Sequence, residues 1–194
     1  SYGHKAFSNC INLRNITILG GKTTIESYSF EMCTNLRYIS ILDSETSIGE
    51  AAFYNCINLQ DVTITNAISA IGNLAFYGCR SLVSISFPSR VDSIGEKAFY
   101  ELLKLESIEI LNEVNSIGES AFEKCSMLSS TKFLNGINSI ANRSFYDCTN
   151  LKSITLGTGL TSIGSFAFYQ CKSLTTVGIP ADYNKLNMAA NELN

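Results

Sequence analysis

The sequence predicts a repeat solenoid, mostly β, in which eight 23-residue units form a curved stack with a parallel sheet on its inner face. One physical argument and two observations predict it. No single unit could bury its apolar positions alone, whereas units stacked in register would form continuous apolar ladders. Phenylalanines recur with a 23-residue period, at Phe7, Phe30, Phe53, Phe76, Phe99, Phe122, Phe145 and Phe168. A leucine stands six residues after each of them, at Leu13, Leu36, Leu59, Leu82, Leu105, Leu128, Leu151 and Leu174.

A strand is expected after each of these leucines. Apolar residues stand nine and eleven residues after the phenylalanine, as at Ile39 and Ile41, with polar residues on either side of the first. This period of two indicates a strand with one buried face. In the sixth unit the first of these positions is taken by Thr131.

A corner is expected where each unit closes. An apolar residue stands five positions before the next phenylalanine position, an isoleucine in seven units and Leu186 in the last, and glycine usually follows it. Glycine suits a tight turn in which a Cβ would clash or a positive φ is required. The segment A-F-x-x-C then places Phe and Cys three residues apart, so one short helical or 3-10 turn would present both side chains inward.

The cysteines of seven units occupy one column of the stack. Parallel Cβ vectors in such a column disfavour disulfides, and a straight ladder offers no tetrahedral zinc site. A nucleophilic cysteine needs a basic neighbour, and the single histidine, His4, lies at the N-terminal end. One unit replaces the thiol with Leu102. We therefore interpret the column as small, buried, apolar packing residues: Cys10, Cys33, Cys56, Cys79, Cys125, Cys148 and Cys171.

The complete unit reads L-x-x-I-x-I, a polar turn, and I-G-x-x-A-F-x-x-C. From residue 2 to about residue 180 it resembles the BspA-like (Treponema pallidum-type) leucine-rich repeat. The resemblance implies a leucine-rich-repeat solenoid, a curved right-handed superhelix with its parallel sheet on the concave face. We expect residues 1–180 to form a single leucine-rich-repeat domain cut from a longer array. Residues 181–194 are expected to form a degenerate repeat or cap, because Asn191 occupies the phenylalanine position.

The concave face of the sheet is the predicted ligand surface, since curved repeat proteins usually bind through it. Its side chains are small and rich in hydroxyls, which fits broad, shallow, polar contacts. The alternative is that Ser and Thr are simply favourable in exposed strands. Glu109 and Lys132 would form a cross-strand ion pair within this surface. The predicted binding residues are Thr17, Tyr38, Ser40, Asp61, Thr63, Ser84, Ser86, Ser107, Glu109, Ser130, Lys132, Ser153 and Thr155.

A second candidate surface is the tyrosine column that directly follows the phenylalanines. Such tyrosines could stack on sugars or anchor a protein partner. They could equally stack on one another along the outer surface and cover the turn beneath. The column is Tyr54, Tyr77, Tyr100, Tyr146 and Tyr169.

Composition excludes several partners. The net charge is -3 and the pI is about 5.2, so a nucleic-acid groove or an anionic membrane surface is disfavoured. No apolar run reaches the ~18 residues of a membrane span, so no direct membrane insertion of this segment is expected. No catalytic constellation, metal site or cofactor motif is recognised, and we expect no enzyme activity and no cofactor.

Two functions remain. The resemblance implies a recognition or adhesion module of a cell-surface or secreted protein, since BspA-type repeats are typical of surface proteins of bacteria and protists. Its partner would be an extracellular-matrix, host or cell-surface protein, or a glycan. The alternative is an intracellular scaffold that assembles protein partners on the same face.

Overall fold

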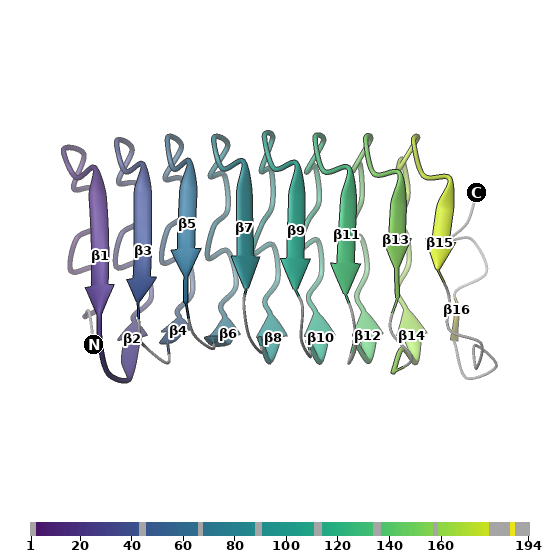
Figure 1. Ribbon diagram of the computed structural model, residues 1–194, viewed down its shortest axis with the longest axis horizontal. Helices are drawn as coiled ribbons and strands as arrows, with labels where there is room; N and C mark the ends of the chain where they lie inside the picture. Colours follow the sequence, from purple (N-terminus) through teal and green to yellow (C-terminus); the bar gives the residue numbers. More distant parts are fainter. Residues whose placement is uncertain are drawn as a thin grey trace.

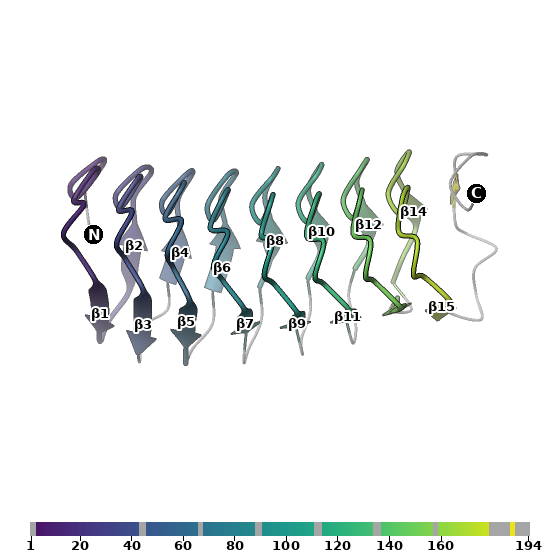
Figure 2. The ribbon, with the colours of Figure 1, turned by 90° about the horizontal axis from the view of Figure 1, so that it is seen from above.

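The coils of the chain follow one another along a single long axis, with only a slight bend in either view (Figures 1 and 2). The computed structural model describes residues 3–42, 46–65, 68–87, 91–110, 114–133, 137–156, 159–178 and 187–188. Each coil contributes one strand to each of two parallel sheets, and a corner of turns closes it. The strand in the second sheet is the shorter of the two except in one coil, where β5 (Asp61–Ile64) and β6 (Ile68–Ile71) have equal lengths. The predicted solenoid with a parallel sheet is therefore confirmed.

The two sheets each contain eight strands, all parallel to their neighbours. The long-strand sheet contains, in spatial order, β1 (Asn15–Leu19), β3 (Tyr38–Leu42), β5 (Asp61–Ile64), β7 (Ser84–Phe87), β9 (Ser107–Ile110), β11 (Ser130–Phe133), β13 (Ser153–Thr155) and β15 (Thr176–Gly178). The short-strand sheet contains β2 (Thr23–Ile25), β4 (Thr46–Ile48), β6 (Ile68–Ile71), β8 (Ser93–Ile94), β10 (Ser116–Ile117), β12 (Ser139–Ile140), β14 (Ser162–Ile163) and β16 (Asn187–Met188).

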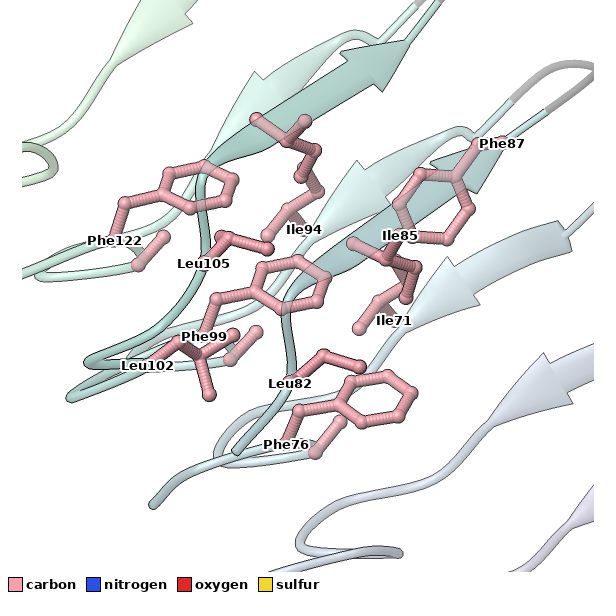
Figure 3. Close-up of a cluster of buried hydrophobic side chains, with 14 of the residues drawn as sticks. Ile71, Phe76, Leu82, Ile85, Phe87, Ile94, Phe99, Leu102, Leu105 and Phe122 are labelled. Carbon is pink, nitrogen blue, oxygen red and sulfur yellow. The ribbon is translucent and has the colours of Figure 1, made fainter. Parts of the chain in front are cut away.

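The phenylalanine column forms the spine of the core. Every neighbouring pair of rings from Phe7 to Phe168 is stacked, with centroids 5.1 to 5.5 Å apart and planes within 16° of parallel. Figure 3 shows Phe76, Phe99 and Phe122 lying in such a row, beside leucines that precede the strands and isoleucines within them. The rings of the inner coils are inaccessible to solvent, so each contributes its full apolar area to the core.

The corner contains no helix in the part of the chain that the structure describes, so the predicted helical or 3-10 turn is wrong. Ala51 and Asn55, on either side of Phe53, have φ values of 49° and 54°, and the same two positions are left-handed in every described corner. Left-handed residues cannot continue a right-handed helix. They orient every second peptide group parallel to the axis of the solenoid. The Phe53 N–H donates to the Ala75 carbonyl of the next coil at 2.8 Å, whereas the Tyr54 N–H donates to the Ala51 carbonyl within its own coil. In a helix both N–H groups would donate to carbonyls of the same coil. Hydrogen bonds to the next coil therefore favour consecutive turns over a helix.

The glycine that follows each corner isoleucine is required by close approach between coils. A Cβ on Gly95 would lie 2.5 Å from the backbone nitrogen of Asn73, and Gly49, Gly72, Gly118 and Gly164 meet equally close backbone atoms. None of these five glycines has a positive φ, so of the two reasons for glycine it is the steric one that applies.

Two coils carry Glu26 and Ala141 in place of this glycine, and these are the two coils in which serine replaces the alanine before phenylalanine. The Ser144 hydroxyl donates to the Ala141 carbonyl at 2.7 Å and lies 3.1 Å from the Gly118 carbonyl of the preceding coil. Ser29 makes the equivalent contacts with the carbonyls of Glu26 and Gly3. The single hydroxyl proton can be shared between the two carbonyls, so the serine adds a polar contact between coils at the place where glycine is missing.

In the last coil, the residue in the isoleucine column differs from the one that the repeat predicts. β16 pairs with β14 so that Met188 lies opposite Ile163, two residues later than the 23-residue period requires. The prediction that Leu186 continues the isoleucine column is therefore wrong, because the last coil is two residues longer. Leu186 and Asn191 themselves lie outside the described residues.

One buried column was not predicted from the sequence. It lies three residues before the corner isoleucine, where the polar turn was expected, and it extends the core beside the short strands. Its members are Ile68, Val91, Val114, Ile137 and Leu160.

Candidate binding surface

The outward side of the long-strand sheet, here called the strand face, brings the predicted binding residues together. They form two parallel columns because each strand pairs with the next in a 23-residue register. One column pairs Tyr38 with Asp61, Asp61 with Ser84, Ser84 with Ser107, Ser107 with Ser130, and Ser130 with Ser153. The other pairs Thr17 with Ser40, Ser40 with Thr63, Ser86 with Glu109, Glu109 with Lys132, and Lys132 with Thr155.

Most of these side chains are exposed, and the rest of those described are half-buried. Tyr38 is the largest, with 47% of its surface exposed and its hydroxyl donating to Gln60 Oε1 at 3.2 Å. The Asp61 carboxylate accepts a hydrogen bond from the Thr63 hydroxyl at 3.1 Å. The strand face is therefore a row of small polar groups with one large aromatic anchor near its N-terminal end.

The predicted ion pair between Glu109 and Lys132 falls partly outside the description. The register places the two backbones opposite one another on β9 and β11. Their side chains lie outside the described part of the structure. The pair therefore stays a prediction.

A third outward column lies at the entry to each long strand and was missed from the sequence. It begins with Arg14 and Arg37, and the Arg37 N–H donates to the Arg14 carbonyl at 2.8 Å. In the pattern L-x-x-I both intervening residues point outward. The alternation of a strand, counted back from the isoleucine, predicts an outward side chain only for the second of them. The full column is Arg14, Arg37, Gln60, Val83, Glu106, Ser129, Lys152 and Thr175.

The tyrosine column lies on the corner, away from the strand face. Tyr54, Tyr77 and Tyr100 stack on one another with centroids 5.0 and 4.8 Å apart and planes 14° and 1° from parallel. Both faces of Tyr77 are thus covered by its neighbours, and Lys124 Nζ lies 5.2 Å from the centroid of the Tyr100 ring. Because stacking on a sugar needs a free ring face, the mutual stacking favours the structural interpretation for Tyr77, which has neither face free.

Charges at the corner are also paired internally. Arg143 donates to both oxygens of Glu123, at 3.1 and 2.9 Å, and its guanidinium lies 4.1 Å from the centroid of the Tyr146 ring. Burial alone would raise the pKa of Glu123, but hydrogen bonds from Arg143 and Ser120 hold that pKa below its usual value. This corner ion pair is therefore satisfied within the chain, in contrast to the arginines of the entry column.

The seven cysteines are free thiols, of which five are buried, Cys171 is half-buried and Cys10 is exposed. The predicted burial is therefore wrong for Cys10, in the first coil, and two features add to the packing interpretation for the others. Cys56 Sγ donates a hydrogen bond to the Phe30 carbonyl of the preceding coil at 3.2 Å, and the same contact recurs at 3.1 to 3.2 Å for Cys33, Cys79, Cys125, Cys148 and Cys171. Burial raises the pKa of Cys125 from 9.0 to about 12, so the thiol stays protonated at neutral pH. A protonated, hydrogen-bonded thiol is a poor nucleophile.

Among the described residues, no group of three or more His, Cys, Asp or Glu side chains is placed to hold a metal ion. No helix with the length and apolar character of a membrane span occurs among them.

Comparison with known proteins supports the fold. The chain is similar to the crystal structure of a leucine-rich repeat protein of T. pallidum, with 24% identity over 84% of this chain and 78% of that one, and a TM-score of 0.73. Weaker likenesses are to a leucine-rich cell surface protein of Faecalibacterium prausnitzii A2-165 (17% identity, 89% and 85% covered, TM-score 0.42) and to a leucine-rich repeat protein of Eubacterium ventriosum (17%, 86% and 72%, 0.46). Among curated protein sequences there is no match.

The family is given by the sequence pattern itself. The family model described as the BspA type leucine rich repeat region matches residues 1–129 and 116–192, in six copies. These two ranges together cover nearly the whole chain. The chain therefore belongs to the BspA-type leucine-rich repeat family.

Proposed function

We propose that this chain is a non-catalytic recognition or adhesion module that binds its partner through the strand face. One observation carries the proposal: inward positions are apolar in nearly every coil, whereas the outward side chain at one register changes from Tyr38 to Asp61 and then to the serines that begin at Ser84. Outward positions are free of packing constraints, so a partner can select them one by one. The rigid core holds these side chains at fixed spacing, which lowers the entropy lost on binding.

The partner of this surface is a protein or a glycan of the extracellular matrix or of another cell. Small hydroxyl side chains favour extended polar contacts over a deep pocket, and the one aromatic anchor lies at Tyr38. Residues 1–180 act as a single binding domain, with residues 181–194 as its cap or a degenerate repeat. The surface or secreted location rests on the family to which the chain belongs.

The alternative function is an intracellular scaffold that uses the same face. Protease treatment of intact source cells separates the two. Digestion of the protein on intact cells supports the surface module, whereas digestion only after lysis supports the scaffold.

The experiment that tests the binding surface is a screen against immobilised matrix proteins and glycans. It compares the wild-type chain with the triple variant Ser84→Arg/Ser107→Glu/Ser130→Arg, in which alternating charges on neighbouring rungs avoid like-charge repulsion. Substitution of Tyr54 by Ser on the corner is the matched control. The proposal expects binding to fall at least tenfold in the triple variant and to persist in the control. Binding that survives the triple variant would overturn the strand face as the site.

A further inference from the structure

The strand face has its most unusual chemistry at its N-terminal end. Arg14 and Arg37 occupy adjacent rungs of the entry column, about 4.8 Å apart by the spacing of neighbouring strands. Both side chains are exposed. No ion pair or side-chain hydrogen bond joins either guanidinium to another described residue. We call them the arginine pair.

Three other cations of the described chain are paired with carboxylates. Arg80 and Arg143 donate to the carboxylates of Glu101 and Glu123, and Lys97 to that of Glu96. The arginine pair instead places two like charges side by side, which is unfavourable in the free chain. A carboxylate bound between the two guanidinium groups would accept hydrogen bonds from both, and this attraction would offset the repulsion between them.

Apolar groups lie at the opposite end of the same two strands. Leu19 ends β1 with 71% of its surface exposed, and it is in register with Leu42 at the end of β3. The distance along the strands from the arginine pair to these leucines is about 16 Å, from five residues at about 3.3 Å each. Between them lie Tyr38 and the hydroxyls of Thr17 and Ser40.

We infer that the β1–β3 end of the strand face binds an acidic segment of a protein partner, with carboxylates at the arginine pair and an apolar side chain over Leu19 and Leu42. This inference rests on the proposed function and names the partner chemistry of the same face. Arg and Tyr are the residue types that most often dominate protein interfaces. A carboxylate matches the planar fork of arginine in two hydrogen bonds.

A sulfated polysaccharide fits this surface less well. A polyanion needs cations along its length, but the entry column continues with Gln60, Val83 and Glu106, which provide none. It also has no apolar side chain to cover the exposed Leu19. The combination of two cations with an apolar end matches a peptide that carries both kinds of side chain.

The test is a random 12-residue peptide library displayed on phage and panned against the intact chain. Enriched peptides are then synthesised and their affinities measured by fluorescence anisotropy. The inference expects peptides rich in Asp or Glu, with a large apolar residue four to six positions away. Their affinity should fall as NaCl is raised from 50 to 300 mM, because salt screens exposed charges.

Variants locate the binding. Arg14→Gln/Arg37→Gln should weaken these peptides at least tenfold, and Leu19→Ser several-fold. The charge-preserving Arg14→Lys/Arg37→Lys should recover only part of the loss, since lysine cannot form the bidentate contact. The matched control is Lys152→Gln, a single exposed cation five coils further along the same column, which should change affinity less than twofold. Thermal melts establish that each variant is folded.

Three outcomes overturn the inference. One is a panning that enriches no acidic peptide. Another is acidic peptides that bind Arg14→Gln/Arg37→Gln within twofold of wild type. The third is heparin that binds through the arginine pair while acidic peptides do not. If peptide binding is instead lost only in Ser84→Arg/Ser107→Glu/Ser130→Arg, the inference fails and the proposed function stands.

Discussion

The corner and the strand face belong to the same coil, yet they follow opposite rules. At the corner, Phe99 stacks between Phe76 and Phe122 and cannot be exchanged without disturbing both neighbours. On the strand face, Ser107 lies between Ser84 and Ser130, and its side chain is outward and half-buried. Burial in a stacked column therefore marks the positions that hold coils together, and outward exposure marks the positions open to a partner.

The largest expected effect is at the spine. Phe99→Ala removes a fully buried ring that contacts rings on both sides, and should lower the free energy of unfolding by about 3–5 kcal/mol. Urea denaturation followed by circular dichroism measures it. A loss well under about 1 kcal/mol would contradict a continuous phenylalanine spine.

Alkaline pH acts on several buried thiols at once. Burial raises the pKa of Cys125 in the folded chain from 9.0 to about 12 and also raises the pKa of Cys148. The unfolded chain loses these protons first, so the stability that the neutral thiols provide is complete below pH 9 and declines as pH rises toward 12.

Urea denaturation at pH 8, 9.5 and 11 should therefore show decreasing stability. The variant Cys125→Ala should be less stable at pH 8 but show a shallower decline. If the stability of this variant declines with pH as much as that of the wild type, ionisation of Cys125 does not cause the decline.

The glycine column should tolerate no side chain without compensation. Gly95→Ala places a Cβ 2.5 Å from the Asn73 nitrogen and should cost about 1–3 kcal/mol, as overpacking usually does. At Ala141 the bond from its N–H to the Ile117 carbonyl is 3.1 Å, against 2.8 Å for Gly95, which agrees with slightly separated coils. The serine found with Ala141 predicts that Gly95→Ala/Ala98→Ser recovers part of the loss. Equal melting temperatures for the single and double variants would show that the serine does not compensate.

The smallest expected effect is a gain at an irregular core position. Thr131 takes the place of isoleucine in β11, and its buried hydroxyl has no hydrogen-bond partner among the described residues. Thr131→Val keeps the shape and removes the unsatisfied group, and should stabilise the chain by about 1 kcal/mol. Ile154→Val, in the same column of the next coil, is the control and should destabilise. A Thr131→Val variant less stable than wild type would mean that the hydroxyl is satisfied in solution.

Much of this fold could be predicted because a 23-residue period is a global signal. The columns of Phe53, Leu59 and Cys56 follow directly from it. The corner conformation could not be predicted, because the spacing of Phe53 and Cys56 fits both a helical turn and consecutive β-turns. The choice depends on hydrogen bonds to the next coil, which are not local. The position of Met188 was not predicted, because Leu186 is the apolar residue that stands 23 residues after Ile163.

The binding surface was only partly predictable. Alternation about Ile39 identifies Tyr38 and Ser40 as outward residues, and the register confirms their placement on the strand face. Alternation does not identify Arg37, because the chain bends between the corner and the strand and exposes two successive residues. The positive charge of Arg14 and Arg37 at one end of the strand face was therefore recognised only from the structure.

The central claim is that stability and recognition use different columns of the same coil. Its most direct test is the free energy of unfolding of Ser84→Arg/Ser107→Glu/Ser130→Arg, measured in urea beside wild type. Outward substitutions that touch no core residue should leave this free energy within about 1 kcal/mol of the wild-type value. A loss comparable to that of Phe99→Ala would contradict the claim, because it would mean that the strand face also holds the coils together.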